Sequence, residues 1–87
     1  MKPININNAT VDYIAENIVQ LYDSQEYPGY VKSVTRDTVY ANVVIYSAVF
    51  ELDGEKLFMQ QTVYTRPSAT GTFDVTVKRT KVFKFSK

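Results

Sequence analysis

The pair Asp53-Gly54 lies inside a long run of strand-forming residues and constrains the fold more than any other feature of the sequence. A two-residue type I′ turn requires positive φ at both central positions, and Asp-Gly is one of the pairs that adopt it most readily. The flanking residues 38–52 and 55–66 are rich in valine, tyrosine and phenylalanine, which suit a pleated strand. We therefore predict an antiparallel hairpin centred on Asp53-Gly54.

This turn also fixes the register of the hairpin. It places Glu51 opposite Lys56, and a pair of opposite charges favours that register. Both faces are then largely apolar. One carries Tyr40, Val44, Tyr46, Ala48, Phe50, Leu57, Met59 and Val63, and the other carries Val39, Val43, Ile45, Val49, Phe58 and Tyr64. Because a single helix can cover only one face of a sheet, the second face is expected to meet solvent, a fold-back of the sheet or a partner.

An amphipathic helix is predicted before the sheet. Apolar residues recur at the three- and four-residue spacing of one helix face, at Val11, Ile14, Ala15, Ile18 and Tyr22. Candidate N-caps are Asn7, Asn8 and Thr10. We expect the helix to begin near Ala9 or Val11 and to end before the break at Tyr27-Pro28-Gly29. The opposite face is polar apart from Tyr13.

The first strand after the helix is predicted over residues 30–35, followed by a tight turn at Arg36-Asp37. The next run, residues 38–52, would extend roughly 50 Å as one straight strand at about 3.3 Å per residue. Because this length exceeds that of ordinary strands, we expect a bend or bulge near Ser47.

The last strand is predicted after a loop at residues 67–71. Phe73, Val75 and Val77 alternate with polar residues, as in a half-buried strand. Arg79 and Lys81 then interrupt the alternation, so we expect the strand to leave the core, twist or bulge there. At the other end of the chain, residues 2–6 could add a short edge strand or equally form a loose arm.

These elements indicate a single α+β domain over residues 1–87, an N-terminal amphipathic helix packed on a three- to four-stranded antiparallel meander. With 45% hydrophobic residues, the chain can bury one core. The order of elements is similar to the topology of the cystatin-like folds. Cystatin inhibitors present a Gln-x-Val-x-Gly hairpin and a Pro-Trp pair to cysteine proteases. Here the predicted first hairpin reads Thr35-Arg36-Asp37-Thr38 and tryptophan is absent, so the resemblance implies a topology and not that activity.

The composition argues against most enzyme classes. The chain has no cysteine and no histidine, which removes disulfides, thiolate and imidazole metal sites, and nucleophiles that a histidine activates. Its three glycines all lie in turn contexts, so no phosphate-binding loop is expected. The carboxylates Glu51, Asp53 and Glu55 cluster at a hairpin tip, where turn carboxylates are ordinarily solvated. We expect no enzymatic activity, no cofactor, no metal and no membrane span, in a cytoplasmic protein.

The charge is distributed unevenly along the chain. Residues 1–27 hold one lysine and four acidic residues, whereas residues 61–87 hold six cations and one acidic residue. The cations near the end are Arg66, Lys78, Arg79, Lys81, Lys84 and Lys87. Interleaved with aromatic residues, they could contact nucleic-acid phosphates and bases. The simpler interpretation is an edge strand that lysines protect from aggregation, with Phe83 and Phe85 in the core.

Two binding functions therefore stay open. The preferred one is a protein-interaction module that acts through the uncovered sheet face or the helix face that bears Tyr13, with a homodimer as one form. A viral or mobile-element inhibitor of a host enzyme would be another form. The alternative is a small nucleic-acid-binding protein that uses Arg66, Lys78, Arg79, Lys81 and Lys84.

Overall fold

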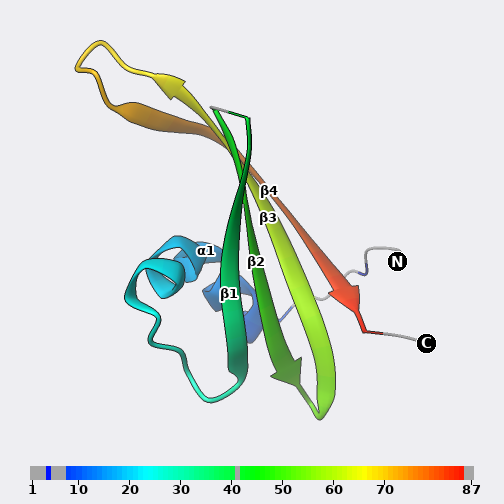
Figure 1. The fold of residues 1–87 in the computed structure, drawn as a ribbon. Coiled ribbons are helices and arrows are strands. Elements are labelled where there is room, and N and C mark those ends of the chain that lie inside the picture. Colours follow the sequence, from blue (N-terminus) through cyan, green and yellow to red (C-terminus); the bar gives the residue numbers. More distant parts are fainter. Residues whose placement is uncertain (1–3, 5–7, 41, 86–87) are drawn as a thin grey trace.

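The fold is one helix packed on a four-stranded antiparallel sheet, as predicted. A computed structural model describes residue 4 and the ranges 8–40 and 42–85. The helix α1 spans Ala9–Ser24, and the strands are β1 (Val31–Tyr40), β2 (Val43–Leu52), β3 (Glu55–Pro67) and β4 (Phe73–Lys84). The strands lie in chain order, β1-β2-β3-β4, so the sheet is a meander with β1 and β4 on its outer sides (Figure 1).

The helix begins and ends where local chemistry caps it. The side chain of Asn8 accepts a hydrogen bond from the backbone N–H of Thr10 at 2.7 Å, which satisfies one of the free donors of the first turn. Gln25 adopts the left-handed conformation after the last turn, and its N–H donates to the carbonyl of Leu21 at 2.9 Å. The helix therefore ends before Tyr27-Pro28-Gly29, as expected.

The Asp53-Gly54 turn and its register are confirmed. Both residues have positive φ, 52° and 78°, as a type I′ turn requires. Glu51 lies opposite Lys56, and the predicted pairing continues along the hairpin to Val44 opposite Val63.

Two expectations for the first strands are wrong. Arg36-Asp37 is not a turn, because β1 continues through both residues to Tyr40, and the connection to β2, which begins at Val43, comes after Tyr40. Asn42, a residue type that tolerates turns, lies in this connection. Nor does a bulge interrupt β2 at Ser47, which pairs in continuous register with Thr35 on one side and Gln60 on the other.

Two expectations for the last strand are also corrected. The register shift falls where Val75 and Val77 pair with Thr65 and Tyr64, not at Arg79 or Lys81. Phe83 and Phe85 do not lie in the core: Val82 is buried instead, and Phe85 is 50% exposed. Since side chains alternate along a strand, a buried Val82 places both phenylalanines on the opposite face.

Ile4 pairs with Val82, so the expected N-terminal edge pairing exists at this residue, and the rest of residues 2–6 lies outside the described part.

The core lies between α1 and one face of the sheet. The helix contributes Val11, Ile14, Ile18 and Leu21, and the sheet contributes Val31, Val34, Tyr46, Ala48, Phe50, Leu57, Met59, Val63 and Val82. Gln61 is buried among them, and its side-chain amide donates to the carbonyl of Ala15 at 2.8 Å and to Thr80 Oγ1 at 3.2 Å. This side chain thus joins β3 to the helix and to β4.

The turn can be tested by replacing Gly54 with valine. No atom lies within 4 Å of an added Cβ at this position, so the cost arises from the positive φ alone. We expect Gly54→Val to lower the free energy of unfolding by roughly 1 kcal/mol or more, because β-branched residues resist this conformation. The matched control is Gly29→Val, which is equally uncrowded and lacks a positive φ. Chemical denaturation would show equal stabilities for the two variants if the turn did not impose this strain.

Candidate functional site

The face of the sheet opposite α1 is the first candidate surface of this molecule. Within residues 4, 8–40 and 42–85, no helix or strand packs over it (Figure 1). Because β2 and β3 alternate between buried and partly exposed residues, the side chains on each face can be assigned. We call this surface the open face. Its partly exposed apolar side chains on β2, β3 and β4 are Val43, Ile45, Val49, Phe58, Tyr64 and Phe83.

Three phenylalanines gather at the end of the open face where β4 leaves the sheet. The rings of Phe58 and Phe83 stack with centroids 4.8 Å apart and planes inclined by 17°. Phe85 lies 5.6 Å from Phe58, and the ammonium of Lys56 lies 5.4 Å from the centre of the Phe85 ring. We call Phe58, Phe83 and Phe85 the phenylalanine cluster. Aromatic pairs of this kind hold one another in place, so the surface is partly ordered before any partner arrives.

The candidate cations of the C-terminal strand do not form one patch. Arg79 and Lys81 pair with Thr62 and Gln60 and lie on the open face. Lys78 and Lys84 pair with the buried residues Val63 and Leu57, so they lie on the helix side of the sheet. Arg66 is further along β3, opposite Asp74 and near the loop between β3 and β4. Lys87 lies outside the described residues.

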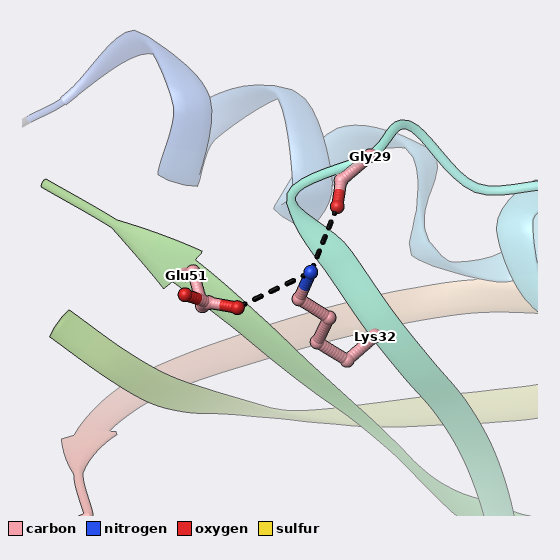
Figure 2. Close-up of polar contacts among 3 residues, drawn as sticks. All are labelled: Gly29, Lys32 and Glu51. Carbon is pink, nitrogen blue, oxygen red and sulfur yellow. Dashed lines mark hydrogen bonds and ion pairs between the residues drawn. The ribbon is translucent and has the colours of Figure 1, made fainter. Parts of the chain in front are cut away.

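Ion pairs account for two of the carboxylates at the hairpin tip. Lys32 Nζ lies 3.2 Å from Glu51 and also donates to the carbonyl of Gly29 at 3.1 Å (Figure 2). Lys84 lies 3.1 Å from Glu55. Both pairs are about half exposed, so each contributes little to stability, but each reduces the charge available to a ligand. Among the described residues, no group of three acidic residues could hold a metal ion.

Two shallow grooves lie near the helix. The first is lined by Tyr13, Asn17, Gln20, Leu21, Ser24, Glu26, Tyr27 and Pro28. Tyr13 is 46% exposed, which places it on the outer helix face where the sequence predicted it. Neither lysine nor arginine occurs between Ala9 and Ser24, so this face is acidic.

The second groove contains Arg36. Its guanidinium carbon lies 4.8 Å from the centre of the Tyr22 ring, and Tyr22 meets Tyr46 edge to face at 5.8 Å. The pKa of Arg36 is raised above its already high value. The main cause is a hydrogen bond with the Tyr46 side chain, and the second is an electrostatic interaction with the Tyr22 side chain. Arg36 is thus a permanent cation. Its contacts give a structural reason why β1 runs straight through the predicted turn.

No family model, curated protein or solved structure matches this chain. Its likeness to the cystatin-like folds therefore rests on the order of its elements. The corrected first hairpin, Tyr40-Ala41-Asn42-Val43, also lacks the Gln-x-Val-x-Gly motif. No helix among the described residues is long and apolar enough to cross a membrane.

The assignment of residues to the two faces can be tested on β4. Val82→Ala removes buried methyl groups and should lower the free energy of unfolding by about 2 kcal/mol. Phe85→Ala removes a larger side chain, but one that is half exposed, and should cost less than about 1 kcal/mol. Urea denaturation measures both values. The reverse order would place Phe85 in the core and Val82 outside it.

Proposed function

We propose that this chain is a non-enzymatic protein-interaction domain that binds a partner protein through the open face of its sheet. The observation that carries the proposal is the uncovered apolar surface of β2, β3 and β4, with the phenylalanine cluster at one end. Aromatic residues are enriched in the centres of interfaces, and adjoining exposed apolar side chains mark interaction sites. A small inhibitor that blocks another protein's surface is one concrete form of this function.

The outer face of α1 is the weaker candidate for the contact surface. Tyr13 is its one large exposed hydrophobic residue, and a single exposed aromatic side chain is common on protein surfaces. The open face instead combines several apolar side chains with cations on neighbouring strands. We therefore assign the contact to the open face.

Two matched aspartate substitutions test this assignment. Phe85→Asp and Tyr13→Asp each place a carboxylate at an exposed aromatic position, on the open face and on the helix respectively. The tagged protein is used to capture partners from an extract of its source organism, with and without nuclease. We expect the tagged protein to capture a partner protein, and this capture should resist nuclease treatment. Phe85→Asp should reduce the amount captured at least tenfold, and Tyr13→Asp should leave it unchanged. Loss of capture with Tyr13→Asp alone would move the contact to the helix.

Single-stranded nucleic acid is the second candidate, and one observation favours it. From Lys56 to Thr62 on β3 and from Arg79 to Phe85 on β4, every charged side chain on the open face is a cation. Aromatic rings and cations together suit bases and phosphates. The geometry of the cluster weakens this candidate, because the stack of Phe58 and Phe83 already occupies one face of each ring.

The placement of the cations supplies a salt-dependence test with an internal control. If Lys56, Arg79 and Lys81 each contact a phosphate, the log-log slope of affinity against salt should be about −2 for single strands, at ~0.7 per contact. Arg79→Gln with Lys81→Gln should then remove about 1.4 from this slope, again at ~0.7 per contact. Lys78→Gln with Lys84→Gln, the same charge change on the helix side, should leave it unchanged. Our proposal predicts no appreciable oligonucleotide binding at physiological salt, measured by fluorescence anisotropy.

A further inference from the structure

The charges on the open face are arranged so that this face is complementary to itself, and we infer that the protein that occupies it is a second copy of this chain. The inference rests on the proposed function, because it names the partner of the same surface. It follows from the register of the sheet, which fixes where opposite charges lie across the four strands.

One transverse row of the open face carries an acid at one end and a base at the other. Asp37 on β1 pairs with Ile45 on β2, which pairs with Thr62 on β3, which pairs with Arg79 on β4. Asp37 and Arg79 are both exposed and lie on the two outer strands. The ion pairs found among the described residues, Lys32–Glu51 and Lys84–Glu55, involve neither of them. Both charges are therefore available to a facing surface.

A two-fold axis parallel to the strands converts this row into two ion pairs. Such an axis sets two open faces against each other and places β1 of one copy over β4 of the other. Asp37 of each copy then faces Arg79 of the second copy. Packed sheets lie about 10 Å apart with nearly aligned strands, a gap that an arginine and an aspartate can bridge from opposite sides. Because the contact is isologous, each favourable pair occurs twice.

The same rotation matches the apolar and neutral parts of the face. It places β2 of one copy over β3 of the second copy. Val49 of one copy therefore meets Phe58 of the other, the same residue that it pairs with inside its own sheet. In the next row, Ser47 meets Gln60, and both side chains are uncharged and able to form hydrogen bonds. In the phenylalanine cluster, Phe58 is thus covered by Val49, and Phe83 meets Ser33, the β1 residue at the other end of its row. No row sets like charges directly against each other among these residues.

Charge reversal at the two ends of the row tests the arrangement. We expect the wild type to form a dimer at tens of micromolar in sedimentation velocity. Asp37→Arg and Arg79→Asp should each weaken the dimer about tenfold or more, since each sets like charges together twice. The double variant restores opposite charges and should recover the wild-type affinity. Asp23→Arg and Lys78→Asp are the matched single controls away from the open face, and both should leave the dimer unchanged.

The outcomes separate this inference from the proposed function. A wild type that stays monomeric, a dimer that neither reversal weakens, or a double variant that fails to recover would each overturn the second copy as partner. A monomer could still capture another protein or an oligonucleotide. If Phe85→Asp abolished that capture, a different occupant would hold the open face. If Phe85→Asp left the capture unchanged, the proposed function would be overturned.

Cross-linking gives a second readout that does not depend on charge. The chain has no cysteine, so Asp37→Cys with Arg79→Cys introduces two thiols at known positions. A short bis-maleimide should join these thiols between copies, because within one chain they lie on opposite outer strands of the sheet. We expect covalent dimers on a denaturing gel from the double variant, at a yield several times that of a Tyr13→Cys control. Equal yields would overturn the arrangement.

Discussion

Among the described residues a single helix of sixteen residues supplies the second layer of this fold, and that constraint decides the character of both sheet faces. The apolar stripe of α1, centred on Ile14 and Ile18, buries the central part of one side of the sheet. The described residues hold no second helix that could cover the other side. Apolar residues that strand formation itself favours are therefore left at a surface, the open face.

The Asp53-Gly54 turn decides which residues receive each role. A strand alternates strictly, so a slip of one residue at this turn would turn the side chains of β3 to the opposite face relative to those of β2. With β2 unchanged, Met59 would then face outward on the same side as Val49, and Phe58 would face the helix on the same side as Ala48. The backbone conformation at two residues therefore controls the composition of the core and of the candidate interface together. This coupling explains why the turn was the most informative feature of the sequence.

Features with a local cause could be predicted from the sequence. The helix has an N-cap residue and an apolar stripe, and the central hairpin has a two-residue turn. The position of the helix and the register of the hairpin could therefore be predicted. The errors fell where tertiary contacts override local preference. Arg36 reads as a turn residue, but its contacts with Tyr22 and Tyr46 hold it in a strand, and those partners are distant in sequence. Gln61 is a polar residue within a strand, and only the tertiary position of Ala15 makes it a buried donor.

The basic C-terminal segment shows why a pattern in sequence need not be a pattern on the surface. Its cations are close together in the chain, but strand alternation sends Arg79 and Lys81 to one face and Lys78 and Lys84 to the other. Lysines on an outer strand discourage unwanted pairing wherever they point, so edge protection needs no particular face. Recognition of a partner does need one face. In our proposal the two roles belong to different residues of the same strand: Arg79 and Lys81 lie on the open face, where a partner would meet them, and Lys78 and Lys84 do not.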